Sequence, residues 1–285
     1  MSLDITQRIR NRYNRLSKGQ KRLASLVLHD CGKVVDLTAS RLGQLVNLSE
    51  STVVRFATVL GYNGYSEFQI AVGELVKSKL TPTQRIEITK KRIGRKDIIE
   101  NVMQADILKL KHTFENLNRD DFYASVDAIL DARTIYIIGA RSTEPVAHLL
   151  SYNLSLIFPN VKHVQVSSTA EIFEQMFSIG ANDVLIAFSF PRYSSKVVNA
   201  VKYASSRNAR VVVITDSMTS PLVQHATYSL IAETDMASFM DSVVAPISII
   251  NTIIIEITHR KEREILDRFD KLEKLWDEYD VYTKK

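Results

Sequence analysis

Hydrophobic residues in the first part of the chain recur at helical spacing, and two of the periodic segments lie close together. Each has the i, i+3, i+4 or i+7 spacing of an amphipathic helix, the first at Leu42, Leu45 and Val46 and the second at Val53, Phe56 and Leu60. Asn47 between them tolerates a left-handed backbone, and Ser49 is a good N-cap. Gly43 leaves room for a close crossing of the two helices. The segment 39–60 is therefore predicted to form a helix-turn-helix.

Further helices are predicted on both sides of this pair. A short basic helix is expected at the start of the chain, and Ser17 with Gln20 three residues later has the pattern of a capping box that begins a second helix. Gly61 is a helix stop, and an apolar stripe predicts a last helix over 65–79. Together these segments predict an all-helical domain over residues 1–80.

From residue 134 onwards the pattern changes to short β-branched or aromatic runs. These runs predict strands over 134–140, 162–167, 184–190, 211–216 and 228–232. Helical stretches separate most of them, over 143–157, 170–179, 195–207 and 221–226. Strands that alternate with helices predict an α/β domain with a five-stranded, mainly parallel sheet flanked by helices. The pattern leaves the order of the strands open.

More helices are predicted before and after the strands. They cover 97–117 and 120–130 before the first strand, and a long helical stretch covers 241–279 after the last. The second half of that stretch repeats apolar residues at spacings of four and three, at Ile265, Phe269, Leu272, Trp276 and Tyr279. This seam favours packing on a partner helix, either in the same chain or in a homodimer. Thr81-Pro82-Thr83 and the basic run after it predict a linker over 81–96, which leaves 97–285 for the α/β domain.

The composition narrows the class of protein. The chain of 285 residues is 45% hydrophobic and 24% charged, as expected of a globular protein long enough for two domains. A lone cysteine, Cys31, excludes a disulfide framework and a cysteine metal cluster, and it favours a reducing compartment. No apolar segment follows a basic start, and the most apolar run, 243–257, is too short and too polar to span a bilayer. A cytoplasmic protein without a membrane partner is expected.

Basic charge is concentrated around the predicted helix-turn-helix. Residues 1–80 carry 12 Lys and Arg against 6 Asp and Glu, whereas residues 107–285 carry 19 against 22. The outward face of the second helix offers short hydrogen-bonding groups and one guanidinium, which suit base edges and phosphates. The predicted contacts with a double-stranded DNA operator are Ser49, Glu50, Ser51, Thr52, Arg55 and Thr58. The alternatives are an ordinary helical hairpin and a helix-turn-helix that contacts only proteins.

Hydroxyl groups and two arginines follow the predicted strands. In open α/β sheets ligands bind beyond the carboxyl ends of the strands, where helix N-termini attract anions. A hydroxyl there can also be a simple helix N-cap, but arginines favour an anion. The first strand leads into Gly139-Ala140-Arg141-Ser142-Thr143 and the third into Ser189-Phe190-Pro191-Arg192-Tyr193-Ser194-Ser195. A ligand site is therefore expected at Gly139, Arg141, Ser142, Ser189, Arg192, Ser194 and Ser195.

Candidate acids and bases are scattered over the second domain. His148 and His225 lie inside helical stretches, where a structural role is typical, and Glu144 begins a helix, where a carboxylate favours the helix dipole. Glu233 follows the fifth strand, where it can contact a hydroxyl group of a ligand, and His163 lies in the second strand. No two of these residues have a recognisable catalytic or metal-binding spacing. No catalytic residue, cofactor or metal site is predicted.

Three stretches of the first domain carry a family resemblance. They are Leu16-Ser17, then Ser49-Glu50-Ser51-Thr52-Val53-Val54-Arg55-Phe56, then Leu60-Gly61-Tyr62-Asn63-Gly64-Tyr65-Ser66-Glu67-Phe68. They resemble the N-terminal domain of the RpiR family of bacterial transcriptional regulators, and the match spans nearly the whole segment.

Residues 120–260 resemble the sugar isomerase (SIS) domain, the usual C-terminal partner in that family. By position, Gly139 and Ser142 match the first phosphate-loop motif, Ser189 and Ser194 match hydroxyls of the second, and Thr215, Ser220-Pro221-Leu222 and Glu233 fall at expected places. One departure is that Pro191-Arg192 replaces the family's frequent Ser-Gly pair. Without that glycine the backbone approaches a phosphate differently, although Arg192 offers a charge-assisted contact.

The resemblance implies a DNA-binding transcriptional regulator of sugar metabolism genes, controlled by a phosphosugar bound in the SIS domain. A homodimer or homotetramer is also expected, and a dimer would present its recognition helices about 34 Å apart. The alternative function is a sugar-phosphate isomerase with an accessory DNA-binding domain.

Overall fold

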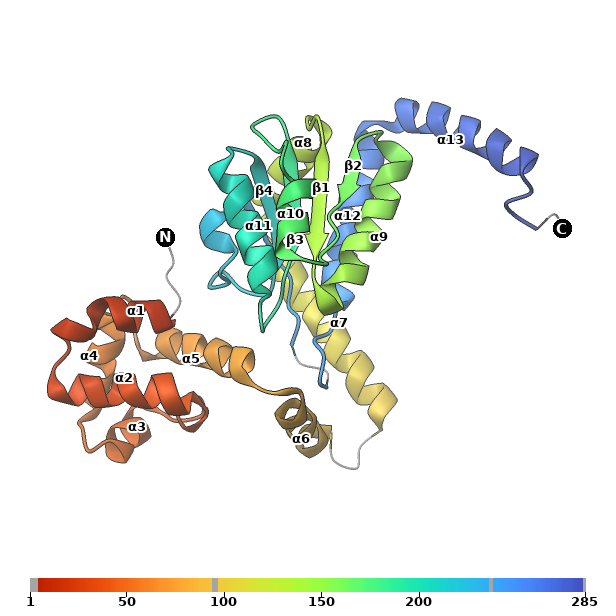
Figure 1. Ribbon diagram of the computed structural model, residues 1–285. Coiled ribbons are helices and arrows are strands. Elements are labelled where there is room, and N and C mark those ends of the chain that lie inside the picture. The colour runs from red at the N-terminus through yellow and green to blue at the C-terminus, as the bar shows by residue number, and fades with distance from the viewer. Residues whose placement is uncertain (1–4, 94–96, 236–237, 284–285) are drawn as a thin grey trace.

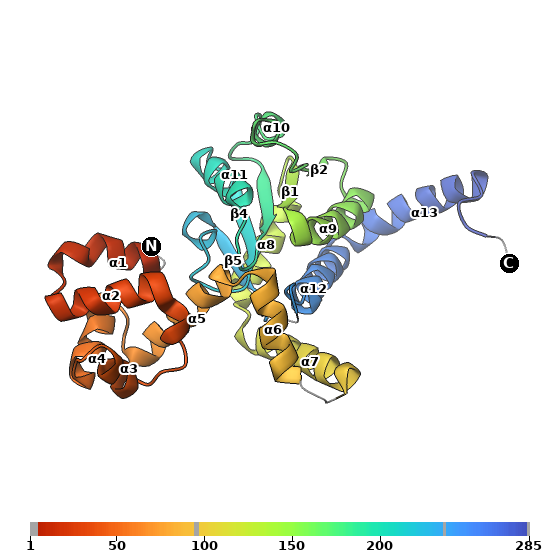
Figure 2. The same ribbon diagram turned by 60° about the horizontal axis from the view of Figure 1, so that its bottom comes forward.

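The computed structural model describes residues 5–93, 97–235 and 238–283. A helical head, residues 5–79, lies beside an α/β domain, residues 98–283 (Figure 1). Helix α6 (Pro82–Ile93) lies between the head and helix α7 (Ile98–Asn116), as both views show (Figure 2).

The head consists of helices packed around one apolar core. They are α1 (Ile5–Arg12), α2 (Lys18–Asp30), α3 (Ala39–Leu45), α4 (Glu50–Val59) and α5 (Tyr65–Lys79), with short 3₁₀ turns at 13–15 and 31–33. Leu23, Leu42 and Val53 are fully buried, and Phe56 meets Phe68 edge to face with ring centroids 5.7 Å apart. Burying each such side chain contributes about 1.5–3 kcal/mol, so the periodic apolar faces hold the helix-turn-helix together.

The turn between α3 and α4 has the geometry predicted from the sequence. Asn47 adopts a φ of 52°, and the Ser49 hydroxyl accepts the backbone hydrogen bond that caps α4, at 3.3 Å. A Cβ on Gly43 would lie 2.6 Å from the carbonyl oxygen of Leu48, so this close approach requires glycine. The prediction that Leu45 joins the buried face is wrong. Its side chain is 53% exposed, because α3 ends at this residue and no neighbouring helix covers it.

Arg8 of α1 stabilises the C-terminal end of α4. Its Nη1 donates to the carbonyl oxygens of Leu60 (3.2 Å) and Gly61 (2.8 Å), groups that a helix end leaves unsatisfied. Gly61 has a φ of 85°, the left-handed conformation expected of the predicted helix stop. The Arg8 guanidinium also lies over the Tyr62 ring, 4.5 Å from its centroid. A basic residue of α1 therefore holds α4 in place.

The segment predicted as a linker contains helix α6. The backbone N–H of Thr81 donates to Gln84 Oε1 (2.9 Å), and the backbone N–H of Gln84 donates to Thr81 Oγ1 (3.3 Å). This pair is a capping box, and Pro82 follows at the first helical position, where its missing N–H costs nothing. The Thr81-Pro82 pair, interpreted above as part of a linker, is therefore the start of a helix.

The α/β domain is built on a parallel sheet. In the described residues its strands are β1 (Ile135–Gly139), β2 (Val161–His163), β3 (Val184–Phe188), β4 (Arg210–Thr215) and β5 (Tyr228–Ile231), in the order β2-β1-β3-β4-β5. Every pair is parallel, and Gly139 lies opposite Phe188. Strand β2 is shorter than predicted, because after His163 the chain makes one more ladder bond, from Val164 N–H to the Ile137 carbonyl (2.8 Å), and leaves the sheet.

Helices cover both faces of the sheet. They are α8 (Arg119–Leu130), α9 (Glu144–Ile157), α10 (Thr169–Gln175), α11 (Ser195–Ser206) and α12 (Val244–Arg260), with 3₁₀ turns at 141–143 and 223–225. Alternate strand residues enter two cores, as the period of two along a strand requires. Ile135 and Ile137 pack with α8, α9 and α12, whereas Tyr136 and Ile138 pack with α10 and α11.

The predicted C-terminal helical stretch consists of two helices, α12 and α13 (Glu262–Glu278), which meet at Lys261. The apolar run in α12 is buried, as expected, at Ile249 and Ile253. Helix α13 extends away from the domain (Figure 1), and its predicted seam is buried at Ile265 but 70% exposed at Tyr279. Within the described part of the chain, no helix combines the length and apolar character needed to cross a membrane.

Candidate DNA-binding and ligand-binding sites

The outward face of α4 carries the residues predicted to contact DNA. Glu50, Ser51, Arg55 and Thr58 are exposed, and Thr52 is half-buried. The Ser49 hydroxyl lies 2.9 Å from the Thr52 hydroxyl and 2.9 Å from the Ser51 hydroxyl, and the Thr58 hydroxyl donates to a backbone carbonyl of its own helix. Among these six residues, Glu50 and Arg55 are the charged ones, and both are exposed. Leu45, exposed at the end of α3, adds an apolar group that the sequence prediction missed.

A cleft opens where the strand order reverses between β1 and β3. The chain leaves β1 toward α9 and leaves β3 toward α11, on opposite faces of the sheet. Such a switch point leaves a crevice outside the carboxyl ends of the strands. Five of the predicted ligand residues line it, namely Arg141, Ser142, Ser189, Arg192 and Ser194. Its volume of about 350 Å³ falls within the range of roughly 300–1,000 Å³ typical of small-molecule sites.

The loop after β1 is tightly fixed. Gly139 leaves no room for a side chain, since a Cβ there would lie 2.3 Å from the carbonyl oxygen of Thr143. The buried Thr143 hydroxyl accepts from Ala140 N–H (2.8 Å) and lies 3.1 Å from the carbonyl oxygen of Phe188 on β3. Arg141 adopts a φ of 60°, a left-handed conformation that is uncommon for arginine. Gly139 therefore shapes the loop from beneath, while Arg141 and Ser142 are exposed at the cleft.

The loop after β3 keeps a glycine-like backbone without glycine. Arg192 has a φ of 65°, at the position where the family resemblance led us to expect glycine. Ser189 is buried and its Oγ accepts from Ser194 N–H at the start of α11 (3.3 Å). Thr215 at the end of β4 donates to the Ser189 carbonyl oxygen (2.7 Å). Ser195, also predicted to bind the ligand, is exposed and does not line the cleft.

The outer wall of the cleft comes from segments that the sequence analysis did not connect with it. Pro82 and Arg85 of α6 line it, together with Phe239, Met240 and Asp241 from the loop before α12. Arg85 is buried and its Nη1 donates to Asp241 Oδ1 at 2.8 Å. A buried ion pair of this kind fixes the geometry of both partners. Helix α6 is thus locked onto the α/β domain at the mouth of the cleft.

The cleft continues into a more acidic part. Arg85, Pro191 and Asp241 line both parts, and Glu74, Asp216, Glu233 and Asp235 are added in the acidic one. The predicted ligand residue Glu233 therefore lies in this continuation, away from the hydroxyls of the two loops. Carboxylates accept hydrogen bonds only, so this end suits a hydroxyl-bearing or amine-bearing group.

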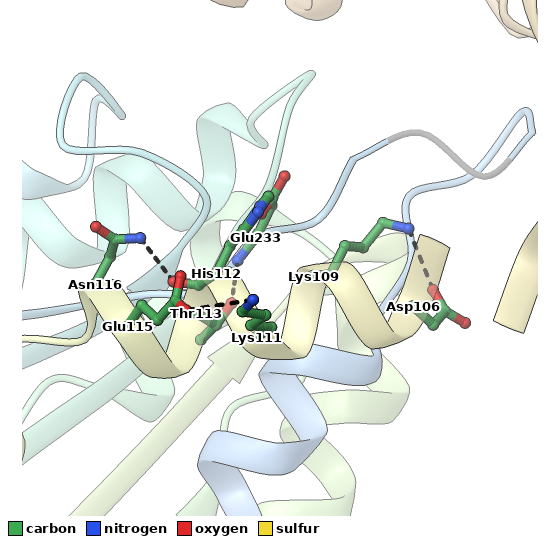
Figure 3. Close-up of polar contacts among 8 residues, drawn as sticks. All are labelled: Asp106, Lys109, Lys111, His112, Thr113, Glu115, Asn116 and Glu233. Atoms are coloured by element: carbon green, nitrogen blue, oxygen red, sulfur yellow. Dashed lines mark hydrogen bonds and ion pairs between the residues drawn. The ribbon is translucent and has the colours of Figure 1, made fainter. Parts of the chain in front are cut away.

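Helix α7 positions Glu233 (Figure 3). The backbone N–H of Glu233 donates to Thr113 Oγ1 (2.9 Å), and its carboxylate lies 2.9 Å from His112 Nδ1. Nearby on the same helix, the buried Lys109 pairs with Asp106 at 3.3 Å. His112 was not singled out in the sequence because 121 residues separate it from Glu233.

A polar chain connects the β3 loop to the head. The half-buried Tyr193 donates its hydroxyl hydrogen to Asp216 Oδ1 (2.9 Å), and burial raises the pKa of Asp216 to about 6. Burial, and then the charge of Asp216, also raise the pKa of Tyr193. Beside Asp216, Ser217 Oγ donates to Glu74 Oε1 (2.5 Å), and Thr219 also donates to Glu74. Because Glu74 belongs to α5, these polar contacts join the cleft to the helical head.

The remaining candidate acids and bases lie elsewhere. Glu144, His148 and His163 come together at the start of α9 and the end of β2, and none of them lines the cleft. His225 ends the 3₁₀ turn between β4 and β5, and burial, followed by the charge of Lys202, lowers its pKa. Glu233 is thus the one member of the predicted acid and base set that lines either part of the cleft.

Comparison with known proteins supports both halves of this description. The family described as "Helix-turn-helix domain, rpiR family" matches residues 3–79, and the SIS domain family matches residues 128–256. An uncharacterized HTH-type transcriptional regulator of Thermotoga maritima is 24% identical over 274 residues, which cover 92% of this chain and 95% of that protein. A similar protein of Haemophilus influenzae, also an uncharacterized HTH-type transcriptional regulator, is 24% identical over 80% of this chain and 79% of its own length.

Two solved structures share the fold. The sugar isomerase domain of an RpiR transcription factor from Sphaerobacter thermophilus covers 61% of this chain and 97% of its own, with 25% identity and a TM-score of 0.57. The Vibrio vulnificus NanR protein, solved in complex with ManNAc-6P, covers 98% of this chain and 99% of its own, with 21% identity and a TM-score of 0.62. The order of the domains, the switch-point cleft and the two family matches agree: the chain belongs to the rpiR family of helix-turn-helix transcriptional regulators and carries a SIS domain.

Proposed function

We propose that this protein regulates genes of sugar metabolism and that a phosphosugar bound in the cleft sets its affinity for DNA. The observation that carries the proposal is the place of α6. This helix follows the last helix of the head, and it also lends Pro82 and Arg85 to the wall of the cleft. A ligand in the cleft therefore touches the element that leads directly to the DNA-binding unit.

The loops after β1 and β3 suit a phosphate. Arg141 and Arg192 are exposed at the cleft and offer charge-assisted, bidentate hydrogen bonds. Ser142 and Ser194 add hydroxyl groups, and Ser194 is the N-cap of α11, where the helix dipole favours an anion. The left-handed backbone of Arg192 keeps the shape that a glycine would give this loop. We infer that the phosphate lies between the two arginines.

The acidic part of the cleft suits the sugar. Asp216, Glu233 and Asp241 present carboxylates on its lining, and such groups accept hydrogen bonds from sugar hydroxyls. A ligand anchored by its phosphate between the loops would extend toward Arg85 and Asp241, which belong to both parts of the cleft. A phosphorylated sugar fits both ends, whereas inorganic phosphate fits one.

Regulation then depends on the contacts between the head and the α/β domain. A ligand shifts the position of the head only if it binds the arrangements with different affinity. A bound ligand can alter two sets of contacts. One is the Arg85–Asp241 ion pair, and the other is the set of polar contacts from Tyr193 through Asp216 to Glu74. On the DNA side, we assign operator contact to Ser49, Glu50, Ser51, Thr52, Arg55 and Thr58.

We further propose that the protein acts in the cytoplasm as a homodimer or homotetramer. Helix α7 exposes apolar side chains along its length, among them Ile99 (71%), Met103 (63%) and Phe114 (69%). Surfaces of this kind mark interaction sites, and the exposed end of α13 adds Leu275 and Tyr279. Two copies would present two α4 helices to half-sites about 34 Å apart. Sedimentation equilibrium gives the oligomeric state.

Fluorescence anisotropy with a labelled duplex from the region upstream of the gene's own operon tests the proposal. Sugar phosphates, including hexose 6-phosphates and ManNAc-6P, are added alongside the same sugars without phosphate. At least one phosphorylated sugar is expected to change the DNA affinity, and its unphosphorylated form is not. Arg192→Ala should remove the response while leaving DNA binding intact. Arg207→Ala, which changes an exposed arginine at the other end of α11, is the matched control. A response that survives Arg192→Ala would contradict the proposed site.

A second candidate function is sugar-phosphate isomerisation. It rests on the His112–Glu233 pair, 2.9 Å apart, because an imidazole beside a carboxylate is a typical acid and base arrangement, and Glu233 lines the acidic part of the cleft. Incubation with the same sugar phosphates, followed by product analysis, tests it. Turnover that is lost in Glu233→Gln would favour the enzyme over the regulator.

A further inference from the structure

A histidine and carboxylate cluster lies outside the cleft. Glu144 and His148 occupy positions i and i+4 on α9, so they lie on the same face of the helix. His163 ends the neighbouring strand β2. One potential ligand atom from each of the three side chains lies within 4.8 Å of the other two. The sequence predicted no metal site here because His148 and His163 are 15 residues apart.

His163 is the buried member of the cluster, with a side chain that is 10% exposed. Its Nε2 is inaccessible to solvent and has no hydrogen-bond partner among the described residues, and it lies 3.7 Å from Glu144 Oε1. Its Nδ1 lies 3.4 Å from His148 Nδ1 and 3.1 Å from Gln165 Nε2. A buried nitrogen without a partner costs about 1–3 kcal/mol. Both ring nitrogens therefore face groups that bind cations or carry protons.

We propose that Glu144, His148 and His163 form a binding site for Zn²⁺ or a similar divalent transition metal. Imidazole nitrogens and a carboxylate oxygen are the ligands that such ions prefer. With zinc–ligand bonds of about 2.0–2.2 Å, a nitrogen and an oxygen ligand of a tetrahedral ion lie about 3.3–3.5 Å apart, close to the 3.7 Å between His163 Nε2 and Glu144 Oε1. Three protein ligands leave a fourth position for water or another ligand.

The neighbours of His163 fix the orientation of its ring. The side chain of Gln165 contacts the same ring, and partners of this kind orient metal-binding histidines. Glu144 directly follows Thr143 in the loop after β1. A metal here would tie β2 to the start of α9 and so brace the loop that carries Arg141 and Ser142.

Metal titration of the full chain, with its purification tag removed and after treatment with a chelator, tests the site. Zn²⁺ is added in competition with a chromophoric chelator. We expect one ion per chain and at least a tenfold loss of affinity in His148→Ala. This variant should fold, because His148 is exposed, and circular dichroism checks that it does. His259→Ala changes an exposed histidine of α12 and should bind as the wild type does.

Two further measurements complete the test. Glu144→Gln should also weaken binding at least tenfold, since it removes the charged oxygen ligand but keeps the shape of the side chain. Co²⁺ in place of Zn²⁺ should give the visible absorption of a four-coordinate ion, and the signal should vanish in His148→Ala. Wild-type binding no tighter than that of His148→Ala would overturn the proposal, and so would an equal loss in His259→Ala.

Discussion

Replacing Asp216 by asparagine is expected to stabilise the protein at neutral pH. The carboxyl group lies on the floor of the acidic part of the cleft, where burial raises its pKa from 3.8 to about 6. Asparagine has nearly the same shape and can still accept the hydrogen bond from the Tyr193 hydroxyl. It carries no charge, so it avoids the cost of a buried carboxylate beside Glu74.

The size of the effect follows from the pKa. The pKa of Asp216 is higher in the folded state than in the unfolded one. The free energy of unfolding is therefore highest below pH 3.8, where the carboxyl group is protonated in both states, and it falls as the pH rises through 6. Each pKa unit corresponds to about 1.4 kcal/mol, so the ionised carboxylate costs about 3 kcal/mol above pH 7. At pH 4.5 the same arithmetic leaves a cost of about 1 kcal/mol.

Urea unfolding of Asp216→Asn and the wild type at pH 7.5 and 4.5, followed by circular dichroism, measures this cost. The free energy of unfolding of the variant should exceed that of the wild type by about 2–3 kcal/mol at pH 7.5. At pH 4.5 this difference should be about 2 kcal/mol smaller. Asp216→Ala is the control, because it also removes the charge but leaves Tyr193 without an acceptor. An equal gain at both pH values, or no gain at pH 7.5, would refute the reasoning.

Four other substitutions address the loops and the head. Gly139→Ala places a Cβ against the backbone of the β1 loop and should cost more than about 3 kcal/mol in urea unfolding; a smaller loss would mean that the loop shifts easily. Arg192→Gly relieves a left-handed backbone, so it should raise stability by about 1 kcal/mol while it weakens sugar-phosphate binding in calorimetry. Glu74→Ala removes the contact with the loop after β4 and should speed tryptic cleavage between head and α/β domain several-fold; an unchanged rate would show that this contact does not hold the head. Arg55→Ala should weaken operator binding by about 1–3 kcal/mol in anisotropy titrations, and unchanged affinity would remove this residue from the DNA surface.

Local signals were enough to predict the helix-turn-helix. Asn47 in the turn, Ser49 as the cap and Gly61 as the stop all act within a few residues of their own position, so the sequence displays them directly. The capping box of Thr81 and Gln84 is equally local. Helix α6 differs from the predicted linker because Pro82 begins the helix, and the first turn of a helix accepts proline.

Long-range contacts could not be predicted in the same way. The strand order depends on how each crossover packs, and the residue pattern along a strand is the same in several orders. Arg85 joins the cleft by pairing with Asp241, which is 156 residues away. The predicted ligand set therefore divides in the structure. Five of the residues after β1 and β3 meet at the switch point, whereas Ser195 lies outside the cleft and Glu233 belongs to the adjoining acidic part.

The capped start of α6 has a mechanical consequence. A flexible tether would absorb a small movement at the cleft, but a helix of 12 residues is a rod about 18 Å long. A pivot of about 10° at one end displaces the other by about 3 Å, close to the 3.4 Å rise between neighbouring base pairs. A small rotation of α6 at the cleft would thus displace the head by about the spacing of one base pair.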